Sequence, residues 1–463
     1  MSEIKSAVMV PHPPLIMENI GRGEEKKIQD IIDAYKQAGK TIVESNPDTV
    51  VIISPHAPSY YDYIQLSSGP AGRGDMSQFG DRQDAFVIPY DTEMIERISE
   101  LADENGIPAG TLGQQDGSLD HGTMVPLYFL KDLKPETKFI RIGVGGPDNL
   151  MHYALGELIA KAAGELGRKV AVVGSGDLSH CQKAGTHYGF KACGPAYDQK
   201  IMDVMGRAAF DELLQMSDQE ADEAMVCGQK PFCVMAGVLD GLKPESHKLA
   251  HSAEFGVGYG VVTYDNLTED KDRHFGEKEA ERQRIETEKR IANEDPWVKL
   301  ARDTINEAIL NQSVLPVPAG LPSDFYNSRA GAFVSIHENG NLRGCIGTTE
   351  PTQPTLAQEI IANAISASTR DPRFPAIAPY ELDNLEINVD VLGEPEDIAS
   401  EDELDVKKYG VIVTKGGRRG LLLPDLEGVD TVEKQVSIAK QKAGLSPNEP
   451  GCSLQRFEVV RHK

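Results

Sequence analysis

Three histidines follow segments that the sequence predicts to be strands, and imidazole is the side chain that proteins use most often to bind metal ions. His12, His56 and His180 each stand within a few residues of the end of an apolar, β-branched run. Prolines flank His12 and His56, which limits the conformations of those two loops. Because the carboxyl ends of parallel strands meet at one edge of an open sheet, we expect these imidazoles to converge on one divalent metal ion.

A metal site of this kind needs a further ligand besides two imidazoles. Two histidines and one carboxylate on one face leave open coordination positions and favour Fe(II). We choose Glu254, which stands among small residues just before the last strand predicted for this half, with His251 and Asp177 as alternatives. The predicted ligands are therefore His12, His56 and Glu254. Fe(II) is the first choice of metal, and Zn(II) or another divalent metal is the alternative.

Other polar residues at the same strand ends could move protons. Asp177 and His180 lie three and six residues beyond Gly174, near which a predicted strand ends, and His121 lies in a Leu-Asp-His-Gly segment. A histidine beside the metal could take a proton from a substrate hydroxyl, and a carboxylate could fix its tautomer. We predict His180, His121 and Asp177 as catalytic residues. A single histidine after a strand is more often structural, and the hypothesis depends on three occupying equivalent positions.

Short apolar runs alternate with amphipathic stretches through the first half of the chain. Strand-like residues 6–11 and 49–54 enclose residues 28–45, whose apolar positions have helical spacing. The alternation continues to about residue 174, which predicts an α/β fold with a mainly parallel sheet flanked by helices. We place this metal-binding domain at residues 1–268.

A charged segment separates the two halves. Between residues 269 and 295 there are ten acidic and seven basic side chains and almost no apolar ones, so this stretch cannot supply a core. We interpret residues 269–294 as a charged linker. Helical and strand-like patterns then mix irregularly over residues 295–463, which predicts a smaller α+β domain.

Composition excludes several classes of partner. The formal charge of −25 would repel nucleic acid and anionic membranes, and the chain has no apolar run near 18 residues. The beginning of the sequence lacks the pattern of an export signal, and the six cysteines show no C-x-x-C pairing. We therefore expect a cytoplasmic protein with no nucleic-acid or membrane partner. Its oligomeric state is left open, a homo-oligomer included.

The histidine segments, taken in order, resemble the LigB-like superfamily, which contains class III extradiol ring-cleaving dioxygenases and the Memo family. The likeness covers about residues 5–265 and rests on the segments around His12, His56, His121 and 177–180. In the dioxygenases two histidines and a glutamate bind Fe(II) and another histidine is the acid/base. The resemblance implies His12, His56 and Glu254 as ligands and His180 as that acid/base. Memo proteins often have cysteine at the position matched to Glu254, so glutamate here is more similar to the catalytic branch.

The second half resembles the AMMECR-type domain through Leu342–Gly347, Asp371–Pro375 and Lys442–Leu445. Such fusions are known beside a radical S-adenosylmethionine protein, which the resemblance suggests as a partner. From the residues themselves, Arg343 and Cys345, together with Gly344 and Gly347, could form an anion-binding loop with a nucleophilic thiol, since a nearby cation lowers a thiol pKa. A tight structural turn with a buried cysteine is the equal alternative.

The sequence thus predicts a non-haem Fe(II) enzyme of the extradiol dioxygenase type. Its substrate would be a small phenolic or catechol-like aromatic compound, and the AMMECR-type domain would be accessory. Two alternatives remain open. One is a zinc-dependent hydrolase on the same site, and the other is a Memo-like metal-binding adaptor without catalysis.

Overall fold

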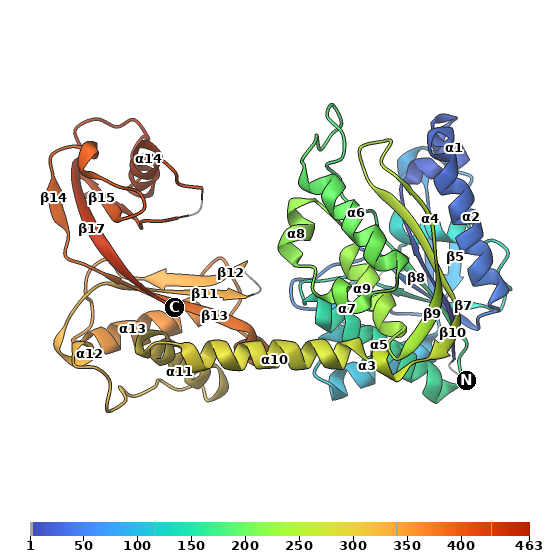
Figure 1. The fold of residues 1–463 in the computed structure, drawn as a ribbon, viewed down its shortest axis with the longest axis horizontal. Coiled ribbons are helices and arrows are strands. Elements are labelled where there is room, and N and C mark those ends of the chain that lie inside the picture. Colours follow the sequence, from blue (N-terminus) through green and yellow to red (C-terminus); the bar gives the residue numbers. More distant parts are fainter. Residues whose placement is uncertain (1–2, 116, 339–340, 427) are drawn as a thin grey trace. The chain divides into compact units, whose positions relative to one another are not determined.

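The computed structural model describes residues 3–115, 117–338, 341–426 and 428–463. The chain divides into two compact units, unit 1 at residues 1–283 and unit 2 at residues 284–463 (Figure 1). The division falls inside helix α10 (Phe275–Asn293), within the charged segment at 269–294.

Unit 1 is built on a mixed, mostly parallel sheet of six strands. In spatial order these are β7 (Lys138–Ile142), β2 (Thr49–Ile53), β8 (Val170–Ser175), β1 (Ile4–Val10), β10 (Tyr259–Glu269) and β9 (Leu242–Ser252). Strands β7, β2, β8 and β1 run parallel, and β10 and β9 add an antiparallel pair at one edge. This confirms the predicted mainly parallel sheet. The sequence analysis did not foresee β9, because its polar residues do not read as a buried strand.

The register of the central strands decides where the functional side chains emerge. Gly174 of β8 lies opposite Met9 of β1 on one side and opposite Ile53 of β2 on the other. All three strands therefore end at the same level, and the loops that follow them start side by side. Strand β10 runs antiparallel to β1, so its beginning lies at this same edge of the sheet.

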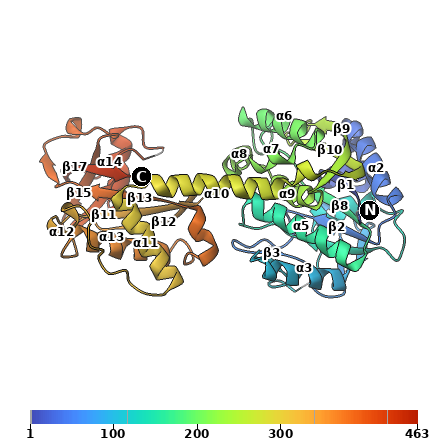
Figure 2. The same ribbon diagram turned by 60° about the horizontal axis from the view of Figure 1, so that its bottom comes forward.

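Helices flank this sheet, as the alternating pattern predicts. Helix α2 (Gln29–Glu44) packs on β1, β9 and β10, while α9 (Gln229–Val238) packs on β8 and on α5 (Asn149–Leu166), which lies beside it (Figure 2). Helices α5 and α9 approach closely because Gly237 has no side chain. A Cβ there would lie 1.9 Å from the Tyr153 carbonyl oxygen.

The other elements of unit 1 are short or peripheral. The helices are α1 (Glu18–Gly21), α3 (Thr92–Glu104), α4 (His121–Tyr128), α6 (Cys193–Gly206), α7 (Phe210–Leu214) and α8 (Asp218–Glu223). Two small sheets pair β3 (Ile64–Gln65) with β6 (Ala109–Gly110) and β4 (Ala71–Asp75) with β5 (Ala85–Pro89).

Unit 2 is an α+β domain around an antiparallel sheet, as expected. Its strands are β11 (Ala332–Glu338), β12 (Asn341–Gly347), β13 (Leu385–Leu392), β14 (Glu396–Ile398), β15 (Tyr409–Lys415), β16 (Arg418–Leu422) and β17 (Ser453–His462). Its helices are α11 (Pro296–Leu310), α12 (Asp324–Asn327), α13 (Leu356–Thr369) and α14 (Val432–Lys442). Helices α11 and α13 pack together and α14 packs on β15 and β16. Within the described part of the chain, no helix has the length and apolar character to cross a membrane.

Candidate metal centre

His12, His56 and Cys227 meet at the carboxyl edge of the sheet in unit 1. The Nε2 atoms of His12 and His56 are 3.1 Å apart, and Cys227 Sγ lies 3.6 Å from His12 Nε2. One donor atom from each of the three residues lies within 4.8 Å of the others, which is close enough for all three to reach one ion. In the described residues a second such group, at Glu245, His247 and Asp265 on the β9–β10 pair, is half to fully exposed.

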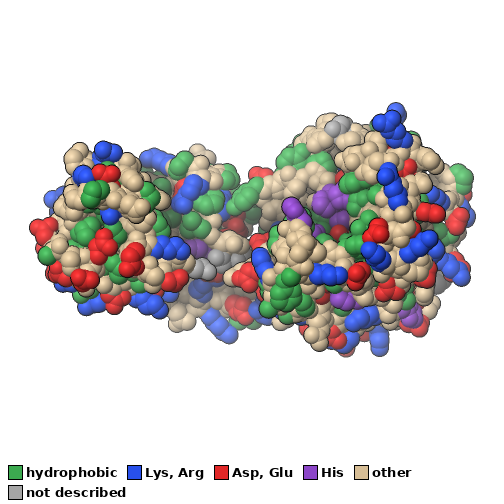
Figure 3. Space-filling view, turned by 90° about the horizontal axis from the view of Figure 1, so that it is seen from above, with side chains coloured by type: hydrophobic (Ala, Val, Ile, Leu, Met, Phe, Trp, Pro, Cys, Tyr) green, Lys and Arg blue, Asp and Glu red, His purple; other side chains and the backbone are tan. Residues whose placement is uncertain are grey.

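These three side chains come from distant parts of the chain. His12 follows β1, His56 follows β2, and Cys227 stands in the loop just before α9. His12 is 1% exposed, Cys227 is partly buried, and His56 is exposed. The centre is thus buried on one side and opens to solvent at His56. In Figure 3, histidine side chains gather in a hollow of unit 1 that hydrophobic side chains border.

Hydrogen bonds fix the tautomer of His12. Ser175 Oγ donates to the Gly122 carbonyl oxygen at 2.6 Å, so this hydroxyl accepts a hydrogen bond from His12 Nδ1 at 3.1 Å. The proton of the neutral ring then sits on Nδ1, and Nε2 presents its lone pair towards His56 and Cys227. This is the ring orientation that a metal ligand requires.

Both histidines are held in the neutral form. Burial, followed by the nearby His56, His121 and His180, lowers the pKa of His12 well below its ordinary value. Burial also lowers the pKa of His56, although Asp120 partly opposes this. A neutral imidazole binds a metal without first losing a proton, so both rings suit the role.

Cys227 completes the donor set with a thiol. Burial and the Asp177 carboxylate raise the pKa of Cys227 above its ordinary value. The Asp177 backbone N–H donates to Cys227 Sγ at 3.3 Å, which fixes the position of the sulfur. A divalent cation would favour the thiolate form of this residue. The two imidazoles and the sulfur therefore fit a transition metal ion.

Glu254, the predicted third ligand, lies outside this group. Its side chain is 49% exposed and lies 3.3 Å from the Lys183 ammonium group. The segment that carries Glu254 lies at the expected edge of the sheet. It connects the edge strand β9 to β10, and the Glu254 side chain there points to solvent. The alternative His251 is also engaged, since its Nε2 lies 2.9 Å from Asp198 Oδ2. The third donor that lies beside the two imidazoles is Cys227, which sequence reasoning missed.

The structure brings His121 to the centre. Its ring lies 4.2 Å from that of His56 and 5.4 Å from that of His12, between ring centroids. Burial and the neighbouring His56 lower the pKa of His121 to about 4, so this ring is neutral near pH 7. His121 is the first residue of α4. Asp120 caps that helix and accepts a hydrogen bond from Ser54, which lies two residues before His56 in the sequence. His121 can therefore accept a hydrogen bond from a bound molecule.

His180 and Asp177 lie in the loop that follows β8. His180 Nδ1 lies 3.1 Å from the Leu178 carbonyl oxygen, which favours the tautomer with the proton on Nδ1 and the lone pair on Nε2. Asp177 accepts a hydrogen bond from the His12 backbone N–H at 2.8 Å, and its Oδ2 lies 3.9 Å from His12 Nε2. Burial raises the pKa of Asp177 to about 7. Both groups thus have the protonation states that proton transfer near neutral pH requires.

In unit 2 the structure corrects the interpretation of Arg343. Its guanidinium group is buried and donates to Glu381, with distances of 2.6 Å from Nε and 3.1 Å from Nη2. It also donates to the carbonyl oxygens of Pro375 and Ala376, so it is not available to an anion from solution. The partner of this arginine is a carboxylate of the same unit, and its role is structural.

Cys345 has a different cationic neighbour. Its Sγ lies 3.1 Å from Ser335 Oγ, and its carbonyl oxygen accepts a hydrogen bond from Arg373, whose side chain is 53% exposed. Asp371 pairs with Arg373 and accepts the Cys345 backbone N–H. A nucleophilic role for Cys345 stays a prediction.

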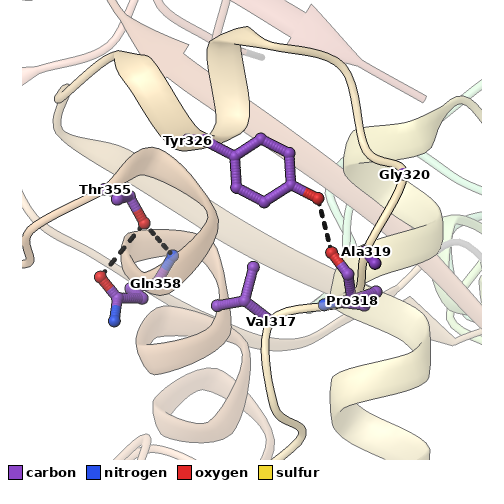
Figure 4. A pocket seen from close by; sticks show the side chains of 7 residues that line it. All are labelled: Val317, Pro318, Ala319, Gly320, Tyr326, Thr355 and Gln358. Atoms are coloured by element: carbon purple, nitrogen blue, oxygen red, sulfur yellow. Dashed lines mark hydrogen bonds between the residues drawn. The ribbon is translucent and has the colours of Figure 1, made fainter.

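An open pocket of about 570 Å³ also lies in unit 2, beside the start of α13 (Figure 4). Tyr326 donates its hydroxyl hydrogen to the Pro318 carbonyl oxygen, and the Thr355 side chain caps α13. None of the seven residues that line the pocket carries a carboxylate, an imidazole or a thiol. Its polar lining groups are the hydroxyls of Tyr326 and Thr355 and the amide of Gln358.

Comparison with known families agrees with both sequence resemblances. Residues 6–262 match the model of the catalytic LigB subunit of aromatic ring-opening dioxygenases, and residues 298–462 match the AMMECR1 model. These matches confirm the interpretation of the chain as a LigB-like half followed by an AMMECR-type half.

Relatives and solved structures extend this comparison. Protein CA_C1420 of Clostridium acetobutylicum is 35% identical over 98% of each chain. A protein of Thermotoga maritima is 52% identical, over 37% of this chain and all of its own. Among solved structures, the uncharacterized protein PH0010 of Pyrococcus horikoshii is 32% identical, with a TM-score of 0.34, covering 36% of this chain and 88% of its own. The uncharacterized protein JW3007 of Escherichia coli is 14% identical, with a TM-score of 0.40, covering 56% of this chain and 99% of its own.

Proposed function

We propose that this chain, which belongs to the LigB family, is a metal-dependent enzyme that acts on a small phenolic or catechol-like substrate. The observation that carries the proposal is the convergence of His12, His56 and Cys227 beneath two further histidines. Fe(II) is the metal we propose first, in keeping with the dioxygenases for which the family is named.

The metal would be held by His12, His56 and Cys227. When bound, a divalent metal lowers the pKa of a coordinated hydroxyl group and leaves open positions for a second reactant. The protein prepares this site by fixing the His12 tautomer through Ser175 and by keeping both imidazoles neutral.

His180 is the group that we propose to accept the substrate proton. Its Nδ1 proton is engaged with the Leu178 carbonyl, which leaves Nε2 as an acceptor for a phenolic hydroxyl hydrogen. Burial lowers the pKa of His180, so the ring is neutral near pH 7 and can take up that proton. Asp177, whose pKa burial raises to about 7, would hold or return a proton beside it.

Aromatic side chains beside the histidines support a flat, apolar substrate. Phe79 lies edge-on to His121 at 5.4 Å, and Tyr188 lies edge-on to His180 at 5.3 Å, between ring centroids. Rings in these orientations offer apolar surface to an aromatic molecule. A hydroxyl on that molecule would face the imidazoles.

The test uses the full chain loaded with Fe(II) under anaerobic conditions. We expect about one Fe(II) per chain, a new charge-transfer absorption band on addition of catechol, and turnover of one or more catechols when oxygen is admitted. His180→Ala should keep the iron and lose turnover by roughly 10²–10⁴-fold, the usual contribution of acid–base catalysis. His337→Gln, at a partly buried histidine on β11 of unit 2, is the matched control and should behave as the parent. Iron-loaded protein that neither binds nor converts any of several catechols would contradict the proposal.

Cys227 favours a second candidate function, a zinc-dependent hydrolase. Thiolate is a softer ligand than carboxylate and is common among the ligands of Zn(II). In that case Asp177 would act as the base for a water molecule. Zn(II) retained after anaerobic purification in the presence of both metals, together with cleavage of a chromogenic ester, would favour the hydrolase.

A further inference from the structure

Two cysteines that the proposed function does not use lie beside the metal centre. Cys181 directly follows His180, and Cys193 is the first residue of α6. Both are free thiols in this structure. The residues between them, 182–192, form the loop that carries Tyr188.

The contacts of the two thiols place them next to one another. Cys181 Sγ donates to the Ala224 carbonyl oxygen and Cys193 Sγ to the carbonyl oxygen of the preceding residue, Glu223, each at 3.4 Å. A Cβ built on Gly194, the neighbour of Cys193, would lie only 3.0 Å from Cys181 Sγ. Burial and the neighbouring Cys193 thiol raise the pKa of Cys181.

The backbone already holds the two ends of the loop together. Gln182 and Phe190 form an antiparallel bridge, and the Lys191 N–H donates to the Cys181 carbonyl oxygen at 3.0 Å. A covalent bond between the cysteines would therefore close a loop whose ends the backbone already holds together.

The two thiols also differ in accessibility, as an exchange reaction requires. Cys181 is completely buried, whereas Cys193 is partly exposed. A small disulfide from solution can thus reach Cys193 first, and Cys181 is positioned to resolve the product.

We propose that Cys181 and Cys193 form a dithiol–disulfide site that low-molecular-weight disulfides oxidise and that regulates the neighbouring metal centre. Cys193 as thiolate attacks one sulfur of the small disulfide, which forms a mixed disulfide and releases one thiol. Cys181 then gives up its proton and attacks Cys193 Sγ, which forms the intramolecular disulfide and releases the second thiol. The two cysteines lose two electrons and two protons, and the small disulfide gains them.

The disulfide would restrain the loop at 182–192. Tyr188 of this loop lies against His180, and Lys183 pairs with Glu254. Oxidation is therefore expected to change access of a substrate to His180 without removing a metal ligand. This last effect rests on the proposed function, whereas formation of the disulfide does not.

The test treats the purified full chain with excess oxidised glutathione, then blocks remaining thiols with an alkylating reagent. Trypsin cleaves after Lys183 and Lys191, so the two cysteines fall on separate peptides that a disulfide would join. We expect the joined peptides in oxidised protein, their separation after reduction, and a mass loss of two hydrogen atoms in the intact chain. Cys193→Ser should abolish the joined product, while Cys452→Ser, at a partly exposed cysteine of unit 2, should not.

Two outcomes would overturn the proposal. One is that the alkylating reagent still modifies both cysteines after treatment with oxidised glutathione, in protein that circular dichroism shows to be folded. The other is that Cys193 stays joined to glutathione while Cys181 remains a thiol. Cys181→Ala provides a second variant should Cys193→Ser fail to fold, and it should stop the reaction at the mixed disulfide. Because these measurements do not depend on turnover, their failure is distinct from failure of the proposed function.

Discussion

Replacing the third ligand is the sharpest test of the metal centre, because sequence and structure assign it to different residues. We predict that Cys227→Ala weakens metal binding strongly and that Glu254→Ala leaves it within about threefold of the parent. Cys227 Sγ lies 3.6 Å from His12 Nε2, whereas the Glu254 carboxylate is half exposed and paired with Lys183. The two substitutions therefore form a matched pair.

The magnitude follows from the number of ligands. Removing a group that merely orients a ligand costs about 10–100-fold in affinity, so loss of one of three ligands should cost about 100-fold or more. A 100-fold loss corresponds to about 2.7 kcal/mol of binding free energy. Stability should change less, because Cys227 lies in a loop and is only partly buried.

The assay is an anaerobic competition titration of Fe(II) and Zn(II) against a coloured chelator. Substitution with Co(II) adds an independent readout, since a cobalt–thiolate bond gives a near-ultraviolet charge-transfer band that Cys227→Ala should remove. Parent-like affinity in Cys227→Ala combined with a large loss in Glu254→Ala would refute the reasoning. It would mean that the β9–β10 connection turns inward when metal binds.

Three further predictions concern the residues that support the sites. Ser175→Ala should weaken metal binding by about 10–100-fold, measured by the same titration, because the hydroxyl no longer fixes the tautomer of the buried histidine. Arg343→Met should destabilise unit 2 by about 3–5 kcal/mol, since it leaves the Glu381 carboxylate buried without its partner. Urea unfolding followed by the fluorescence of the single tryptophan, Trp297, measures this loss, and a change below about 1 kcal/mol would contradict it. Burial raises the pKa of Glu157 from 4.5 to about 7, so the folded protein keeps a proton that the unfolded chain releases, and its stability should fall as pH rises from about 5 to 7. Glu157→Gln should lose up to about 3 kcal/mol of this pH dependence in calorimetry, and an unchanged dependence would contradict the assignment.

The sequence could predict that the residues after β1, β2 and β8 lie close together, because parallel neighbouring strands end at one edge of the sheet. Strand β8 lies between β1 and β2, all parallel, so residues after these strands must emerge together. His12 and His56 were identified from that argument alone. Which ring nitrogen carries the proton depends on hydrogen bonds formed in the folded protein, such as the one between His12 and Ser175. The spacing of residues in the sequence does not predict these bonds.

The third ligand could not be found in the same way. Cys227 does not follow a strand; it stands in a break between α8 and α9, where Met225 has a φ of 59°. The local sequence reads as continuous helix, and a lone cysteine there carries no signal. Glu254 carries a carboxylate, which can bind a metal, and it lies at the same edge of the sheet as the histidines. The β9–β10 hairpin turns its side chain away from them. Choosing between them requires the direction of each side chain.

Arg343 illustrates a different limit. A basic residue between glycine and leucine reads as exposed, because arginine is seldom buried without a partner. Its partner, Glu381, is 38 residues away in the sequence, in a short turn before β13. One sequence alone gives no indication of this pair, so an anion-binding loop and a structural turn stayed equal alternatives.

The hydrogen bonds that orient the histidines run entirely to atoms of the protein, from Ser175 to Gly122 and from His180 to Leu178. These contacts involve no ion, so we expect the imidazoles to keep their orientation with or without one. The ion could then exchange with a cellular supply without any refolding of the chain, unlike the zinc of a finger domain. How much of the protein is loaded would then depend on the free concentration of the metal in its surroundings.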